Sequence, residues 1–461
     1  MNPDHKPVIQ RLRSGLGAQS FSQAANLFIR LAEVPLFLTY WGAERYGEWL
    51  MVAAIPAYLA MADGGFTGAA RREMIMRMGA GDRRGALATF QSAWVLLLAI
   101  SVALMGLAVL ATNLLPIDQW LSLQSMQGET LTLVILFLVA HIIISFQCGL
   151  IYGGYSCEGR YGRGINFGTL MYLLDFAGMA FAVILGGGPV AAAGGFLAGR
   201  TLALLIYLID FSSVAPWLRF GWQHASKELI SRLLRPSLAS MAFPLGEALN
   251  VQGMRLVVGF VLGPVDVAVF STIRTLCRSA MKPIAVISHL IEPEIALAYG
   301  AGKHDIVRKL FTRSSQITLW ATSPACLLLW FLGEALLGWW TRNQISLNDP
   351  LYAFLLMASI VNSIWFTALM VPYATNRHEP VAFLFFLANG GMLLLASGFM
   401  TWFGLTGAGV AVLLTEMAMV GAILPTAFRL SDVTLGIWLE QVVKLPKFRF
   451  GMLRRNSTGL L

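Results

Sequence analysis

Residues 79–112 read GAGDRRGALATFQSAWVLLLAISVALMGLAVLAT, and this stretch decides the fold class. A glycine turn and a basic loop lead into an apolar run, 87–112, that contains no Asp, Glu, Lys or Arg. A helix needs about 20 mostly apolar residues to cross the hydrocarbon core of a bilayer. The run therefore predicts a membrane-spanning helix with a charged loop at its N-terminal end.

Similar apolar segments fill most of the 461 residues. The chain is 57% hydrophobic and 12% charged, whereas soluble domains are about 45–50% apolar and about 25% charged. This composition excludes a soluble globular enzyme, and the four scattered cysteines exclude a disulfide scaffold. We predict an all-α polytopic membrane protein with about 12 transmembrane helices. The expected spans are 17–41, 46–68, 87–112, 131–153, 166–187, 189–212, 236–262, 265–297, 314–338, 350–374, 380–403 and 405–428.

The basic residues predict the orientation, because cytoplasmic loops are enriched in Lys and Arg. With the N-terminus inside, the inner segments hold 25 Lys and Arg, and the outer loops hold only Arg45 and Arg342. We therefore expect both termini in the cytoplasm. The net charge of +9 then faces anionic lipid headgroups, so membrane lipids are the expected partners and nucleic acid is not. Residues 432–445 predict a short interfacial helix.

An internal repeat divides the chain. Gly79-Ala80-Gly81 recurs 221 residues later as Gly300-Ala301-Gly302, and Gly42 matches Gly263 at the same offset. Six spans per copy keep the two copies in the same orientation, so the symmetry axis would lie along the membrane normal. We predict a parallel repeat of two six-helix lobes around a central cavity. The expected parts are a cytoplasmic N-terminus (1–16), an N-lobe (17–212), a cytoplasmic linker (213–235), a C-lobe (236–428) and a basic cytoplasmic tail (429–461).

Charged residues inside the spans predict a binding site, because such charges are costly and usually functional. Arg274, Arg278 and Lys282 recur every four residues and form a stripe about 12 Å long on one helix face. Guanidinium groups match phosphate geometry, so the stripe suits a pyrophosphate. With Arg30 and Arg255, these are the five candidate pyrophosphate-binding residues.

Four acidic residues in the spans are candidates for carrying a coupling ion or for pairing with those cations: Glu33, Asp63, Asp175 and Glu247. Glu33 lies three residues after Arg30 and so on the same helix face. A purely structural ion pair remains open for Glu33, Arg200, Glu334 and Glu416. The scattered histidines and cysteines predict no metal site, and we expect no cofactor.

The N-terminal part resembles a known family. The stretch PLFLTYWGAERYGEW at 35–49, with its Tyr-Gly-x-Trp element, is followed by Asp-Gly-Gly-Phe at 63–66 and by the Gly81-Asp82 turn with Phe90. These elements are similar to the opening of bacterial polysaccharide biosynthesis membrane proteins. Those proteins are the O-antigen (Wzx-type) oligosaccharide-lipid flippases of the multidrug/oligosaccharidyl-lipid/polysaccharide (MOP) exporter superfamily.

The resemblance implies a MATE-like fold that alternates between inward-open and outward-open states. It implies a flippase that moves a polyprenyl-pyrophosphate-linked oligosaccharide across the cytoplasmic membrane for O-antigen and lipopolysaccharide synthesis. It also implies a coupling ion, H⁺ or Na⁺, and a polysaccharide polymerase as a neighbour in the pathway. The family's cavities tend to be cationic, and Arg30 and Arg255 lie on the first span of each lobe.

Two other functions remain open. A cation-coupled multidrug exporter of the same superfamily would need an acidic or apolar cavity, which Asp63 and Asp175 favour and the arginine stripe does not. A membrane-embedded glycosyl transferase or polymerase would need a large outer loop, but the longest expected one spans only about 113–130. We therefore expect a transporter rather than an enzyme.

Overall fold

The computed structural model describes residues 8–63, 65–232, 241–281, 291, 295, 298–375 and 379–446. Nine helices in these ranges are long and apolar enough to cross a membrane, and no strand occurs among them. The helices are α1 (Val8–Leu59), η1 (Ala60–Asp63), α2 (Phe66–Gly79), α3 (Arg83–Leu114), α4 (Ile117–Trp120), α5 (Gly128–Cys157), α6 (Tyr161–Ile184), α7 (Pro189–Val214), α9 (Ala242–Ala248), the π-helix η2 (Leu249–Gly253), α10 (Met254–Leu262), α11 (Pro264–Ser279), α13 (His304–Thr341), α14 (Asp349–Ala374), α15 (Glu379–Phe403), α16 (Leu405–Ser431) and α17 (Leu435–Val443). The predicted all-α membrane fold is confirmed.

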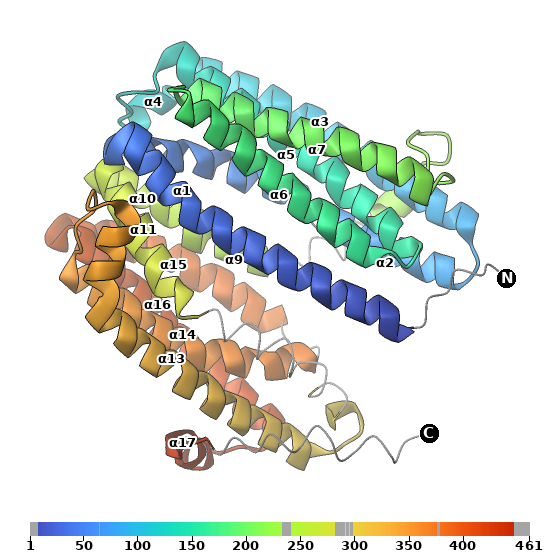
Figure 1. The fold of residues 1–461 in the computed structure, drawn as a ribbon. Coiled ribbons are helices and arrows are strands. Elements are labelled where there is room, and N and C mark those ends of the chain that lie inside the picture. Colours follow the sequence, from blue (N-terminus) through green and yellow to red (C-terminus); the bar gives the residue numbers. More distant parts are fainter. Residues whose placement is uncertain are drawn as a thin grey trace. The chain divides into compact units, whose positions relative to one another are not determined.

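The helices form two compact units. Unit 1 comprises Met1–Thr272, Ala335–Ser346 and Asn389–Ala408, and unit 2 comprises Ile273–Glu334, Leu347–Ala388 and Gly409–Leu461. In unit 1, α1 runs alongside α5 and α6, and α6 packs on α7 (Figure 1). The division into lobes at 213–235 stays a prediction.

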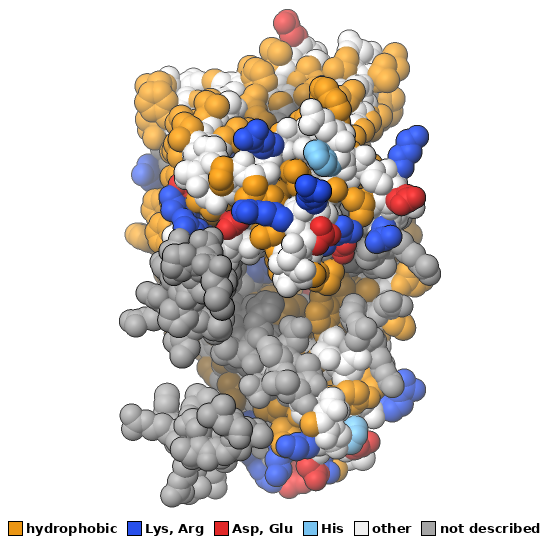
Figure 2. All heavy atoms as spheres, turned by 90° about the vertical axis from the view of Figure 1, so that its right-hand side faces the viewer, with side chains coloured by type: hydrophobic (Ala, Val, Ile, Leu, Met, Phe, Trp, Pro, Cys, Tyr) orange, Lys and Arg blue, Asp and Glu red, His pale blue; other side chains and the backbone are white. Residues whose placement is uncertain are grey.

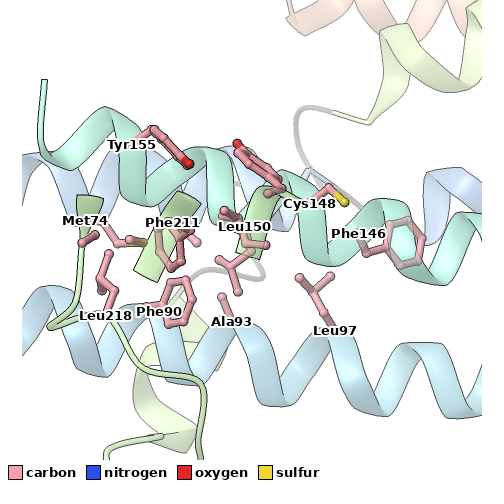
Figure 3. Close-up of a cluster of buried hydrophobic side chains, with 14 of the residues drawn as sticks. Met74, Phe90, Ala93, Leu97, Phe146, Cys148, Leu150, Tyr155, Phe211 and Leu218 are labelled. Atoms are coloured by element: carbon pink, nitrogen blue, oxygen red, sulfur yellow. The ribbon is translucent and has the colours of Figure 1, made fainter. Parts of the chain in front are cut away.

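The core of unit 1 is a cluster of apolar side chains from α2, α3, α5 and α7. Phe90 and Leu97 of α3 are fully buried against Leu150 of α5 and Phe211 of α7. Figure 3 shows these side chains pointing toward one another from their helices. Since lipid is as apolar as these residues, close packing rather than water exclusion holds the helices together.

In both copies of the repeat, the helix is interrupted at a glycine with a positive φ angle and an extended ψ angle. Gly42 has φ 74° and ψ 175°, and divides α1 into two of the predicted spans. Gly263, 221 residues later, has φ 101° and ψ 174° between α10 and α11. Side chains disfavour this conformation, so only glycine adopts it readily. The same unusual backbone at matched positions supports the predicted repeat.

The two Gly-Ala-Gly turns also match. Gly81 and Gly302 both have positive φ, 76° and 68°. The next amide donates to the carbonyl five residues earlier, from Asp82 to Arg77 at 2.8 Å and from Lys303 to Ala298 at 2.9 Å. This is the Schellman cap that ends many helices. The first turn therefore joins α2 to α3, and the second leads into α13.

A segment that follows the sixth span of each copy lies on the third. In unit 1, residues 215–226, the first arm, pack on α3: the Gln91 side chain donates to the Arg219 carbonyl at 3.1 Å and accepts from the His224 amide at 2.8 Å. Phe220 of this arm lies 5.1 Å from the Phe90 ring. The first arm is therefore an ordered part of unit 1 within the expected linker.

In unit 2 the second arm, α17 with residues 444–446, packs on α13 in the same way. Gln316 donates to the Lys444 carbonyl at 2.7 Å, and Trp320 donates to the Val442 carbonyl at 2.9 Å. Thr434 caps the helix by accepting from the Ile437 amide at 3.4 Å. The short helix predicted over 432–445 is confirmed.

One end of unit 1 is strongly charged. There the Arg83 guanidinium lies 3.8 Å from the Glu158 carboxylate and 4.8 Å from the Trp217 ring centroid, so the α2–α3 turn, the α5–α6 turn and the first arm meet. Figure 2 shows Lys and Arg side chains gathered over this end, among acidic ones. The arginines of these segments are Arg71, Arg72, Arg77, Arg83, Arg84, Arg160, Arg163 and Arg219. In the predicted topology, these segments all lie on the cytoplasmic side of the membrane.

The recognised motif at 35–49 is a packing unit. Phe37, Tyr46 and Trp49 stack at centroid distances of 5.3 and 5.7 Å from Phe37. Glu48 is fully buried, and its carboxylate accepts from the Gln124 amide at 2.6 Å and from the amide and hydroxyl of Ser125. Glu48, the residue at position x of the Tyr-Gly-x-Trp element, therefore anchors the predicted outer loop at 113–130.

Candidate functional site

The first group of candidate residues lies in unit 1, where α1 contacts η2 and α10. Glu33 of α1 is half-buried and lies within electrostatic range of Arg255 on α10 and of Arg30 on its own helix. Arg255 donates to the Gln252 side chain at 3.0 Å. Tyr46 is buried and lies within electrostatic range of both Glu33 and Arg255. Glu33 thus lies within electrostatic range of two of the predicted cations, of which Arg30 is exposed.

Two local features position this group. Residues 249–253 form a single π-turn, which shifts the register of the helix just before Arg255. Such turns often occur at functional sites. The backbone of α1 also comes unusually close to α11: a Cβ at Gly47 would lie 1.7 Å from the Pro264 carbonyl oxygen. Glycine is therefore required at position 47, where α1 meets the first residue of α11.

The second group lies in unit 2 and contains two residues of the predicted stripe. Arg274 is buried and Arg278 is half-buried, one turn apart on α11. Glu416 of α16 lies within electrostatic range of both arginines. Its Oε2 accepts from the Trp365 indole at 2.5 Å and from the Asn362 amide at 2.9 Å, both on α14.

The structure describes only part of the predicted stripe. α11 ends at Ser279, and Ala280 and Met281 form a turn. The proline at 283 has no amide hydrogen to donate to the Ser279 carbonyl, which accounts for a helix end here. Lys282 lies outside the described residues. The described part of the stripe is therefore the Arg274–Arg278 pair.

Asp175 sits in a buried ionic network of unit 1. The side chain of Arg200 on α7 makes a bidentate contact with the Asp175 carboxylate on α6, its Nε lying 3.0 Å from Oδ1. His141 Nε2 lies 3.1 Å from Asp175 Oδ2, and Arg200 also donates to Ser145 at 3.0 Å. The network joins α5, α6 and α7.

Close contact between helices makes this pairing possible. A Cβ at Gly199, next to Arg200, would lie 2.2 Å from the carbonyl oxygen of Leu174, next to Asp175. A Cβ at Gly195 would lie 2.3 Å from the Gly178 carbonyl oxygen, one turn away on both helices. The glycines at these positions therefore set the distance between acid and base.

The other two acidic candidates are Asp63 and Glu247. Asp63 accepts from the Thr67 amide at 3.1 Å and from its hydroxyl at 2.6 Å, so its carboxylate is bound to the first turn of α2. Glu247 is exposed on α9. In the described ranges, no group of three or more His, Cys, Asp or Glu is arranged to hold a metal ion.

Sequence reasoning missed the residues that hold these charges in place. Asn362 and Trp365 lie three residues apart in a predicted span, and a polar Asn there is an available signal. His141 likewise interrupts an apolar run. Neither signal tells which charge the side chain will meet, because the partner lies on another helix.

The arrangement of helices described so far is a fold also found in solved membrane transporters, namely MATE transporters of the MOP superfamily and a lipid II flippase. A multidrug resistance MATE family transporter in its inward-facing conformation aligns with a TM-score of 0.69 at 18% identity, over 88% of this chain and 94% of that chain. The lipid II flippase MurJ, in an inward closed conformation, aligns with a TM-score of 0.69 at 16% identity, over 92% of this chain and 90% of that one.

An outward-facing MATE transporter aligns less well, with a TM-score of 0.61 at 16% identity over 92% of this chain and 96% of that chain. No family model and no curated protein sequence matches the chain. The predicted superfamily fold is therefore supported by structure, and the predicted Wzx-type subfamily and its substrate go beyond it.

Proposed function

We propose that this protein is a flippase that moves a polyprenyl-pyrophosphate-linked oligosaccharide across the bacterial cytoplasmic membrane, for the synthesis of a surface polysaccharide such as O antigen. The observation that carries the proposal is the Arg274–Arg278 pair, two guanidinium groups on one face of a predicted span. Such groups bind phosphate oxygens in a fork geometry and do not lose their charge.

The mechanism we propose uses no covalent chemistry. The arginines Arg274, Arg278, Arg255 and Arg30, with Lys282, would bind the diphosphate while the protein alternates between inward-open and outward-open states. An ion gradient of H⁺ or Na⁺ would supply the energy, and both termini would face the cytoplasm. A polysaccharide polymerase would take up the product on the outer side.

A multidrug exporter of the same fold is the second candidate, since MATE transporters align as well as the lipid II flippase does. Cationic drugs call for acidic binding residues. The two acids that favour this function already have partners within the protein. Asp175 forms an ion pair with Arg200, and Asp63 accepts a hydrogen bond from Thr67. The arginine groups therefore favour an anionic substrate.

The test is a flipping assay in proteoliposomes with a fluorescent polyprenyl-pyrophosphate sugar. We expect transport by the wild type and at least about a tenfold loss in the double variant Arg274→Ala/Arg278→Ala, because two charge-assisted contacts would be lost. The matched control is Arg72→Ala/Arg84→Ala, which removes the same charge from exposed positions. Efflux of a cationic dye without movement of the lipid would overturn the proposal in favour of the exporter.

A further inference from the structure

The indole of Trp340 donates a hydrogen bond to the backbone carbonyl of Leu31 at 2.7 Å. Trp340 lies in the last turn of α13 and is only 7% exposed, and Leu31 lies in α1. Both residues belong to unit 1, although they are 309 positions apart in the chain. The bond therefore joins two distant helices through a backbone group of one of them.

The sequence explains why the Leu31 carbonyl is available to a side chain. In an α-helix the carbonyl of residue 31 accepts from the amide of residue 35. Residue 35 is a proline inside α1, and proline has no amide hydrogen. A backbone carbonyl without a donor is costly within a membrane, because lipid offers no replacement. The Trp340 indole supplies the donor that Pro35 lacks.

The end of α13 holds this indole in place. The helix ends at Thr341, whose hydroxyl donates to the Leu337 carbonyl at 2.8 Å. The Asn343 amide then donates to the Gly338 carbonyl, also at 2.8 Å. These bonds close the last turn of the helix within α13 itself and fix the backbone that carries Trp340.

The Trp340–Leu31 bond joins parts of the chain that the sequence assigns to different lobes. Leu31 belongs to the predicted N-lobe and Trp340 to the predicted C-lobe. The Trp41 indole gives a contrast, since it donates to the Gly187 carbonyl at 3.1 Å and both residues belong to the predicted N-lobe. In the predicted topology Trp340 comes just before the outer loop that contains Arg342. The bond between the lobes thus lies toward the outer side.

We infer that the Trp340–Leu31 hydrogen bond is a latch that holds the two predicted lobes together on the outer side and breaks when the protein opens outward. Alternating access requires contacts between the lobes to separate on the side that opens. Once that side is open, water replaces both partners, because it accepts from the indole and donates to the carbonyl. The inference rests on the transport cycle of the proposed function and is independent of the chemistry of the cargo.

The experiment measures outer opening with spin labels at Tyr40 and Gln344, two exposed positions of unit 1. The labels are attached to introduced cysteines after the four native cysteines are replaced by alanine, and their distance is measured by double electron–electron resonance in nanodiscs. Trp340→Phe keeps an aromatic ring and removes the N–H donor. We expect the ratio of long to short distances to rise about fivefold, the usual effect of one net hydrogen bond. The matched control is Trp339→Phe, because Trp339 is 80% exposed and should leave the ratio unchanged.

Pro35→Ala tests the cause of the latch. The alanine amide supplies the donor that the Leu31 carbonyl lacks, so Trp340→Phe should change the ratio much less in this background than in the wild type. Equal effects in the two backgrounds, or a ratio that Trp340→Phe leaves unchanged, would overturn the inference. Pro35→Ala alone should also raise the ratio, because its amide competes with the indole, and this result still tests the latch if Trp340→Phe fails to fold.

Flipping of the fluorescent polyprenyl-pyrophosphate sugar, measured on the same proteins, separates the latch from the proposed function. Normal flipping with distances that do not respond to Trp340→Phe would overturn the latch and leave the flippase standing. Distances that respond as expected, in a wild type that moves no such lipid, would support the latch and overturn the assignment of the cargo.

Discussion

Replacing Asp175 by Asn would remove one charge from the ionic network of α5, α6 and α7. The Asp175 and Arg200 side chains are only 3% and 7% exposed, so water cannot compensate for the loss. Removing one partner of a buried pair costs about 3–5 kcal/mol in soluble proteins. Arg200 retains the Ser145 contact and lies 5.7 Å from the Tyr172 ring, so we expect the lower end, about 3 kcal/mol.

The double variant Asp175→Leu/Arg200→Met separates pairing from packing. It removes both charges and leaves no buried charge without a partner, so it should cost less than either single replacement. The free energy of unfolding can be followed in mixed micelles by titration with sodium dodecyl sulfate, with lipid flipping measured in parallel. The two residues lie beside the close contact of α6 with α7, so we expect stability and transport to fall together in the single variants.

Two results would refute this reasoning. A double variant that loses as much stability as the sum of the single variants would show that the charges do not interact. An Asp175→Asn protein of normal stability that no longer transports would place Asp175 in ion coupling rather than in a structural pair. Ion coupling is one of the roles that the sequence left open for this residue.

Further predictions concern local structure and orientation. Gly42→Ala and Gly263→Ala should each destabilise the protein by about 1–2 kcal/mol, because both positions have positive φ; equal melting temperatures of variants and wild type would contradict this. Glu48→Ala should cost about 1–3 kcal/mol and expose the outer loop to limited proteolysis, since buried amides lose their acceptor. A cysteine at Gln119 should react with an impermeant maleimide in intact cells, and one at Arg84 only after the membrane is opened; the reverse pattern would invert the predicted topology.

The sequence predicted best what depends on neighbours in the chain. The break at Gly42 and the Gly-Ala-Gly turns follow from local backbone chemistry, and the spans follow from runs of apolar residues. Because the two copies are separated by a constant 221 residues, the features of one half predict those of the other. These properties need no knowledge of which helices pack together.

Pairings between distant helices were not predictable in the same way. Arg200 and Asp175 lie on neighbouring spans, but only the close contact at Gly199 shows that they meet. Glu416 is more than a hundred residues from Arg278, and nothing in its own span indicates that partner. Lengths and polar patterns define the helices, whereas the charge balance of a site depends on how those helices are packed.

The two arms bear on how a chain with two halves could have arisen. Each arm follows the last span of its copy and is bound to the third span of that copy through a glutamine, Gln91 or Gln316. If one six-helix ancestor was duplicated and fused, its tail already carried this attachment. The segment that joins the halves today would then descend from a former C-terminus, retained because it was part of the folded ancestor.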